Sequence, residues 1–133
     1  MGGDPMSNPN GSNVPELDVT HWPGVNTLAV SMNRVDFAPG GTNPPHIHPR
    51  ATEVGLVTRG ELLVDIIGSL ESGNRKEEAS MVVSFNSQNP GIVFVPLTMF
   101  GSSPPIPTPV LAKALRVDAQ VVDLIKSKFT GGY

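Results

Sequence analysis

Glycine and proline interrupt this chain so often that only short regular elements fit between them. The sequence has 133 residues, of which 14 are glycine and 14 are proline. Between residues 27 and 96 they separate short apolar runs rich in β-branched side chains, as in TEVGLVT, MVVSFN and IVFVP. Such runs, bounded by turn residues, are typical of strands in an all-β protein. We therefore predict a β-scaffold over residues 27–96.

The individual runs predict strands and their connections. The first strand is expected over Thr27–Phe37, with one face formed by Leu28, Val30 and Met32 and the other by Ser31, Asn33 and Val35. The runs TEVGLVT and ELLVDII flank Arg59–Gly60 and predict a hairpin. The polar run GSLESGNRKEEAS predicts a loop, and MVVSFN and IVFVP predict two later strands.

The two ends of the chain differ from this scaffold. Residues 1–16 are polar and rich in turn residues, which predicts a surface arm. Residues 108–129 have helical spacing, with Thr108 suited to cap a helix and Pro109 suited to its first turn. Asp118 can begin a second helix. We predict a C-terminal helical hairpin whose apolar stripe serves packing, formed by Leu111, Leu115, Val122, Ile125 and Phe129.

Length and charge exclude several classes of protein. A chain of 133 residues is expected to form one domain and can bury a core without disulfides. The net charge is -3, with no run of either sign, which argues against nucleic acid and membrane surfaces as partners. No apolar run approaches the ~20 residues that span a bilayer. No signal peptide is predicted near Met1, and the absence of cysteine argues against secretion.

One short segment carries the residue types of a metal site. His46 and His48 are two apart, so in a strand their side chains point the same way. Glu53 follows and can bring a carboxylate to the same ion, and imidazole nitrogens suit Mn, Fe, Zn, Ni and Cu. A His-x-His pair alone is more often an ordinary surface pair, and Glu53 leaves both interpretations open. We interpret His21, the third histidine of the chain, as structural.

The spacing Gly40-x5-His46-x-His48-x4-Glu53-x6-Gly60 resembles the first cupin motif in its germin form. The segments 16–55 and 81–129 are also similar to cereal germins, and the resemblance covers roughly residues 9–132. It is closest to the cereal oxalate oxidases. The resemblance implies a β-jelly-roll barrel, one manganese ion per subunit, and trimers paired into hexamers. It also implies a secreted protein of the plant apoplast and cell wall that oxidises oxalate with O2 to CO2 and H2O2.

The resemblance assigns roles to particular residues of this chain. It implies that His46, His48 and Glu53 are metal ligands, and that Asn33 and Asn43 are the pocket asparagines that hold oxalate. The sequon Asn10-Gly11-Ser12 matches the glycosylation site of the family, so Asn10 is expected to carry a glycan. Manganese is the expected cofactor, although another divalent ion fits the same donors.

The chain also departs from the family pattern. The second cupin motif, Gly-x5-Pro-x-Gly-x2-His-x3-Asn, is missing, and no histidine follows His48. The segment GIVFVPLTMF imitates that motif, but Gly91 to Pro96 is one residue short. We infer that a block of ~25–30 residues is missing between about Arg75 and Glu77, enough for roughly three strands. The N-terminal portion usual in the family, with its signal peptide and cysteine pair, is also absent from this sequence.

These departures leave three functional hypotheses. The first is a germin-like manganese oxalate oxidase impaired by loss of the fourth ligand, leaving a 2-His-1-carboxylate set with three open positions. The second is a non-catalytic, oligomeric cell-wall glycoprotein, and the third is an activity like that of superoxide dismutase. Losing about three strands should leave the barrel incomplete and expose strand edges, which favours association with other subunits.

Overall fold

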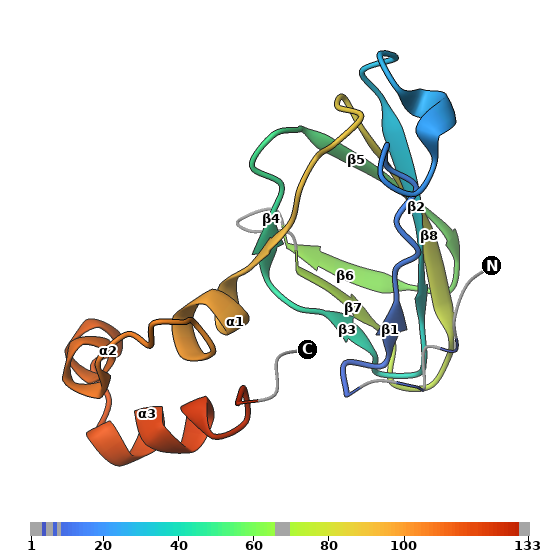
Figure 1. The fold of residues 1–133 in the computed structure, drawn as a ribbon. Helices are drawn as coiled ribbons and strands as arrows, with labels where there is room; N and C mark the ends of the chain where they lie inside the picture. Colours follow the sequence, from blue (N-terminus) through green and yellow to red (C-terminus); the bar gives the residue numbers. More distant parts are fainter. Residues whose placement is uncertain (1–3, 5–6, 8, 66–69, 131–133) are drawn as a thin grey trace. The chain divides into compact units, whose positions relative to one another are not determined.

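The computed structural model describes residues 4, 7, 9–65 and 70–130. The chain divides into two compact units, Met1–Val93 and Phe94–Tyr133, each with its own internal packing. The first unit contains the sheets and the second contains the three α-helices, as Figure 1 shows. No helix among these described residues is long and apolar enough to cross a membrane.

The main sheet of the first unit has four antiparallel strands in the order β1-β2-β8-β5. These strands are β1 (Ser12–Asn13), β2 (Ser31–Phe37), β8 (Ala79–Phe85) and β5 (Glu53–Arg59). A second sheet has the order β3-β7-β6, formed by β3 (Thr42–Asn43), β7 (Leu70–Gly73) and β6 (Leu62–Asp65). A short pair joins β4 (His46–Ile47) to β9 (Val93–Phe94), and the 3-10 helix η2 covers Pro23–Val25. The strands of the described residues therefore form open sheets and no closed barrel.

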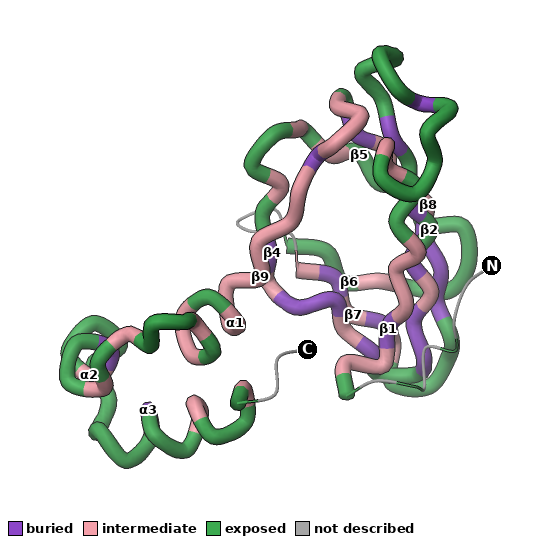
Figure 2. The backbone as a smooth tube through the Cα atoms, in the orientation of Figure 1, coloured by how far each residue is buried: buried purple, intermediate pink, exposed green. Residues whose placement is uncertain are grey.

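The core lies on one face of the main sheet. Side chains along β2 alternate between buried and more exposed, so that Val35 is 2% exposed whereas Met32, on the opposite face, is 46% exposed. Along β8, buried residues alternate with half-buried ones after an entirely buried start. Val35 pairs with Met81, which places their side chains on the same face. Figure 2 shows the buried segments running along these two strands. The apolar core cluster consists of Val35, Phe37, Ala79, Met81, Val83 and Phe85.

The first long strand begins later than the sequence pattern predicts. Thr27 and Ala29 have left-handed backbone angles, with φ of 65° and 55°. Extended backbone cannot run through such residues. The strand β2 therefore starts at Ser31, and its buried face is the one that carries Ser31, Asn33 and Val35.

The predicted hairpin around Arg59–Gly60 is wrong. β5 pairs with β8 in the main sheet, whereas β6 pairs with β7 in the second sheet. Gly60 has a φ of 70°, so the turn is sharp, but it carries the chain from one sheet to the other. The polar run predicted to be a loop contains β7, which is the central strand of the second sheet.

Two further segments differ from the prediction at their edges. Within the predicted arm of residues 1–16, β1 pairs with β2, and the Ser12 hydroxyl donates a hydrogen bond to the Thr42 carbonyl at 2.9 Å. At the run IVFVP the strand β9 covers two residues, and the helix α1 (Val95–Phe100) then begins with Pro96 in its first turn. Proline suits the first turn of a helix because no hydrogen bond is needed from its nitrogen.

The second unit contains the predicted helical segment. Helices α2 (Thr108–Leu115) and α3 (Ala119–Lys126) contact each other and bury Leu111 and Val122. Thr108 does not cap α2; its hydroxyl instead lies 2.7 Å from a carboxylate oxygen of Asp123 on α3. These contacts tie α2 to α3, which agrees with a packing role for the apolar stripe.

The alternation along the main sheet predicts a large difference between two methionines. Met81→Ala should lower the free energy of unfolding by about 2–5 kcal/mol because it leaves a cavity in the core. Met32→Ala, at a position 46% exposed, should change it by less than ~0.5 kcal/mol. Urea denaturation followed by circular dichroism measures both, and equal effects would contradict the assignment of the buried face.

Candidate metal centre

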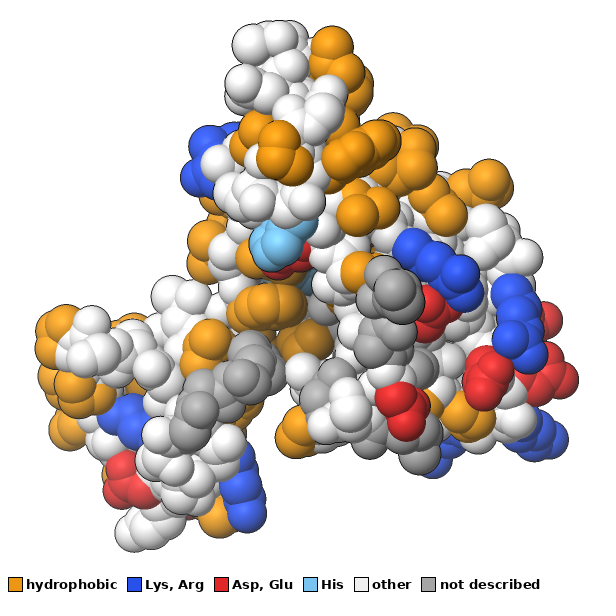
Figure 3. Space-filling model, turned by 45° about the vertical axis from the view of Figure 1, so that its right-hand side comes forward, with side chains coloured by type: hydrophobic (Ala, Val, Ile, Leu, Met, Phe, Trp, Pro, Cys, Tyr) orange, Lys and Arg blue, Asp and Glu red, His pale blue; other side chains and the backbone are white. Residues whose placement is uncertain are grey.

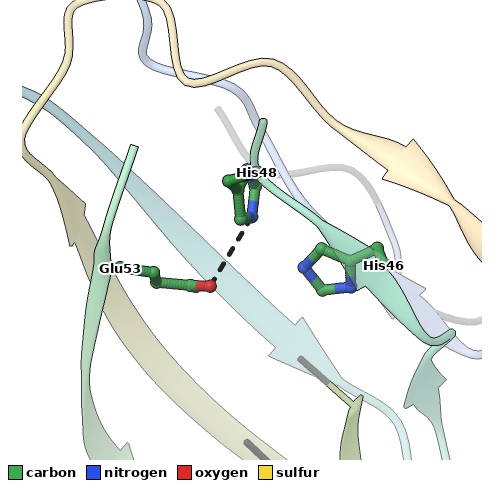
Figure 4. A group of neighbouring side chains, drawn as sticks. All are labelled: His46, His48 and Glu53. Carbon is green, nitrogen blue, oxygen red and sulfur yellow. Dashed lines mark ion pairs between the residues drawn. The ribbon is translucent and has the colours of Figure 1, made fainter. Parts of the chain in front are cut away.

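Three side chains converge at the end of the main sheet. His46 lies on β4, His48 follows directly after that strand, and Glu53 is the first residue of β5. One potential ligand atom from each residue lies within 4.8 Å of the others. Figure 4 shows the two imidazole rings and the carboxylate directed toward a common point. The two histidines and the carboxylate that the sequence singled out are therefore neighbours in space.

Backbone carbonyls fix both imidazole rings. The Nδ1 atom of His46 lies 2.8 Å from the Pro44 carbonyl, and Nδ1 of His48 bonds to the Gly91 carbonyl. Since a carbonyl oxygen only accepts, each Nδ1 carries a proton, and in the neutral form of each ring Nε2 then has the lone pair that a metal ion needs. Such a partner on the other nitrogen is the usual way a protein orients a metal-binding imidazole.

Burial favours the neutral imidazole of His46, which is the form that binds a metal ion. His46 is 1% exposed, and this burial lowers the pKa of its imidazole, as does the nearby His48. Glu53 and the hydrogen bond to Pro44 oppose that shift. A carboxylate oxygen of Glu53 lies 3.5 Å from Nε2 of His48, and the ring of His48 packs against Phe85 at 4.5 Å between centroids. A neutral imidazole beside a carboxylate is a suitable pair of ligands.

The donor set fits a divalent first-row metal ion. Two imidazole nitrogens and one carboxylate oxygen suit Mn, Fe, Zn, Ni or Cu, and they leave further coordination positions open. The rings of His46 and His48 lie at 88° to each other with centroids 5.0 Å apart. This edge-to-face arrangement lets both nitrogens approach one ion without a clash between the rings.

The two asparagines predicted to bind substrate are also buried. Asn33 is 7% exposed and Asn43 is 5% exposed. Asn33 lies on β2 opposite Val83, on the same face as the core, and its side-chain oxygen accepts a hydrogen bond from the Leu17 amide at 2.9 Å. That bond uses the side-chain oxygen, and the NH2 group of the amide is the donor of the Asn33 side chain. Asn43 lies on β3 opposite Glu71.

Glu71 is a buried acid that sequence reasoning missed. It lies on β7, is 3% exposed, and is hydrogen-bonded by the Asn43 side chain. Burial, together with repulsion from Glu53, raises the pKa of Glu71 to about 7, while the bond from Asn43 opposes the shift. Its polar neighbours in sequence made the segment resemble a loop, so no sequence signal separated it from the exposed acids that follow.

The remaining candidate residues lie in other surroundings. His21 is largely exposed and forms ion-pair contacts with Asp18 and Glu16, at 3.4 and 3.8 Å. These three residues are a second group with ligand-type atoms, but two of them are exposed and their polar atoms already contact one another. Asn10 lies in a turn before β1, and its backbone carbonyl accepts a hydrogen bond from the Thr42 amide. Its glycosylation stays a prediction.

Comparison with known sequences gives consistent matches across the chain. The Cupin family model matches residues 3–74 and 70–123. Germin-like protein 3-5 of Oryza sativa subsp. japonica is 70% identical over 158 residues, which cover 99% of this chain and 70% of the relative. Oxalate oxidase GF-2.8 of Triticum aestivum is 66% identical over 153 residues, which cover 96% of this chain and 68% of the relative.

The fold also matches solved structures. A structure described as oxalate oxidase in complex with the substrate analogue glycolate superimposes with a TM-score of 0.90 at 60% identity, over 100% of this chain and 79% of that one. Procruciferin, an 11S globulin from Brassica napus, matches with a TM-score of 0.71 at 16% identity, which shows a similar fold alone. The predicted germin-like fold is confirmed by the first of these matches.

The comparison also reveals an internal gap. The alignment with Germin-like protein 3-5 extends over 158 residues although this chain has 133. At least 25 positions of that relative therefore have no counterpart here. The two segments matched by the family model meet at residues 70–74, next to the predicted break between Arg75 and Glu77. With 70% and 66% identity to these relatives over 99% and 96% of its length, the chain belongs to the germin family of cupin proteins, whose members include the oxalate oxidases.

Proposed function

We propose that this protein binds a manganese ion at His46, His48 and Glu53 and oxidises oxalate with O2. The observation that carries the proposal is the convergence of three ligand-type atoms within 4.8 Å of one another. The identity of 66% to Oxalate oxidase GF-2.8 supports the choice of reaction. Manganese is the ion implied by the kinship, and the donor set accommodates it.

The proposed reaction divides the work between the ion and the side chains. The C–C bond of oxalate breaks to give two molecules of CO2, and the two electrons released reduce O2, with two protons, to H2O2. When bound, the ion supplies the redox and Lewis-acid chemistry of this step. His46, His48 and Glu53 hold that ion. His46 is buried, and the side chains of His48 and Glu53 are only 7% and 16% exposed, which limits access of bulk water.

Asn33 and Asn43 are the residues we propose to hold the substrate. Both asparagine side chains are buried in the first unit, which also contains His46, His48 and Glu53. An amide NH2 group donates hydrogen bonds to carboxylate oxygens. The bond from the Leu17 amide to Asn33 keeps that side chain in one orientation. Oxalate offers four carboxylate oxygens, so it can reach an ion and an amide donor at the same time.

The missing second motif limits how tightly the ion is held. Because no histidine follows His48 in the sequence, the fourth protein ligand of the family has no counterpart. Loss of one ligand should weaken binding by at least the ~10–100-fold typical of losing an outer hydrogen-bond partner. We therefore propose an impaired oxalate oxidase.

The absent histidine also favours a second candidate, a non-catalytic member of the family that binds metal weakly. Kinship alone supports the further proposals that the protein is secreted to the cell wall, carries a glycan at Asn10 and forms homo-oligomers. Exposed apolar side chains are compatible with association, and they include Val54, Leu56 and Leu63, at 70%, 68% and 69% exposure. Figure 3 shows apolar side chains lying open on one face.

The proposed activity has a direct test. With oxalate, O2 and added Mn²⁺, the protein should release H2O2, and Glu53→Ala should lower the rate by at least ~10-fold because it removes a ligand. A matched control is Glu77→Gln, an exposed acid in the turn before β8, which should leave the rate unchanged. Equal, background-level peroxide from all three proteins would favour the non-catalytic candidate.

A substitution of Asn43 distinguishes oxalate oxidation from the alternative activity, dismutation of superoxide. Asn43→Ala should abolish peroxide release from oxalate if this amide holds the substrate. The same variant should spare any dismutation of superoxide, which needs only an accessible ion. Parallel assays with oxalate and with superoxide measure the two rates, and equal losses in both would contradict a role for Asn43 in substrate binding.

Metal binding can be measured without any activity. Added Mn²⁺ should raise the melting temperature, because an ion at 100 times its Kd stabilises the folded state by about 2.7 kcal/mol. His46→Ala should remove this shift, whereas His21→Ala should retain it. Differential scanning fluorimetry measures the shift, and metal analysis after dialysis measures stoichiometry. If the shift persists in His46→Ala and is lost in His21→Ala, the ion binds instead at the group formed by Glu16, Asp18 and His21.

A further inference from the structure

Glu71 is a buried carboxyl group for which the assigned roles leave no function. It occupies the central strand of the second sheet, between Asn43 on β3 and Val64 on β6. Only 3% of the residue is exposed. Its Oε2 atom is buried and has no hydrogen-bond partner within the described part of the chain. Burying an acid with one oxygen unpartnered destabilises the fold, so a compensating function at this position is expected.

The position of Glu71 relates it to the metal centre. Its cross-strand neighbour Asn43 precedes His46 by three residues, and Thr42 anchors the two strands through a hydrogen bond of 2.9 Å to the Glu71 carbonyl. The charge of Glu53 acts on the Glu71 carboxyl group and opposes its ionisation. Two carboxyl groups that repel each other in this way, one buried and the other with 16% of its side chain exposed, are a suitable environment for a cation.

We propose that Glu71 is the second carboxylate of the metal centre and that its negative charge strengthens the binding of a divalent cation by His46, His48 and Glu53. This inference rests on the proposed metal site. Glu71 is not among the residues whose ligand atoms gather within 4.8 Å, so it acts through its electric field rather than as a direct ligand. Two carboxylates balance the charge of a divalent cation, and attraction is stronger in a buried site than in water.

The same residue also positions Asn43. The hydrogen bond from the Asn43 side chain favours the ionised form of Glu71, so the amide NH2 is the donor. A cation that favours ionised Glu71 therefore also strengthens the bond that orients Asn43. In this way Glu71 couples the occupancy of the metal site to the orientation of a residue proposed to hold the substrate.

Three substitutions separate charge from shape. Glu71→Gln keeps the size of the side chain and removes its charge, whereas Glu71→Asp keeps the charge. Glu77→Gln removes a charge in the turn before Ala79, at the opposite end of β8 from Phe85, the residue that pairs with Glu53. Phe85 lies six positions after Ala79 along the strand, a distance of about 20 Å, so Glu77 should exert little influence on the ion.

Isothermal titration calorimetry with Mn²⁺ at pH 8 tests the proposal on the full chain. Glu71→Gln should raise the Kd by about tenfold, the lower range for loss of an outer partner of a metal site. Glu71→Asp should retain most of the affinity, and Glu77→Gln should match the unsubstituted protein. Equal Kd values for Glu71→Gln and the unsubstituted protein would overturn this inference alone. Absence of Mn²⁺ binding by the unsubstituted protein would overturn the proposed function as well.

Folding stability without metal provides an independent measurement on the same variants. A buried acid whose pKa rises from 4.5 to about 7 stabilises the fold below pH 4.5, and that contribution is lost as the pH rises through 7. Metal-free Glu71→Gln should therefore melt at a higher temperature than the unsubstituted protein at pH 8, with a smaller difference at pH 5. If Glu71→Gln is more stable without metal but binds Mn²⁺ more weakly, the result supports a role of the Glu71 charge in cation binding. A loss of both would indicate a structural role and contradict the proposal.

Discussion

The structure of the first unit depends on one strand, β8, which pairs with β2 on one side and with β5 on the other. Its alternate residues Met81, Val83 and Phe85 build the core. The same register sets Phe85 opposite Glu53, so the packing that stabilises the sheet also places a carboxylate next to His48. Register is strongly specified when one face of a strand is buried, because a slip by one residue would expose the core. The packing of this sheet therefore determines where Glu53 lies relative to His48 in the candidate metal centre.

The proposed metal centre lacks the fourth ligand that the family resemblance implies, but two acidic side chains remain in the same unit. The chain passes from β7 to β8 through a turn at residues 74–78, in which the Lys76 amide bonds to the Asn74 side chain at 3.0 Å. This turn connects the second sheet to the main sheet directly. Glu53 and Glu71 remain on the two sheets as acids whose charges repel each other. In a site with fewer ligands and two carboxylates, the affinity for a metal ion should depend more on charge and less on ligand geometry than in a site with four ligands.

The convergence of His46, His48 and Glu53 was predicted well and the strand partners poorly, while metal binding by these three residues stays a prediction. His46, His48 and Glu53 were found because a motif with fixed spacing lies in one short segment, and local geometry brings its members together. The hairpin around Gly60 was wrong because a glycine fixes the shape of a turn but not the sheet that the next strand joins. Glu71 was missed for a similar reason. Its burial depends on pairing with β3, which lies far earlier in the sequence, and the charged residues that follow conceal a strand of four residues.

The three donors lie within eight consecutive residues, from His46 to Glu53. Closing so short a loop costs little conformational entropy, and such loops close within about 10–100 ns. The carbonyl that orients His48 belongs to Gly91, 43 residues further along the chain. During folding, the donors can therefore meet early, whereas their final alignment must wait for a distant segment to arrive. An ion present from the start can serve as a template for that segment, and an ion added later encounters donors that are already aligned.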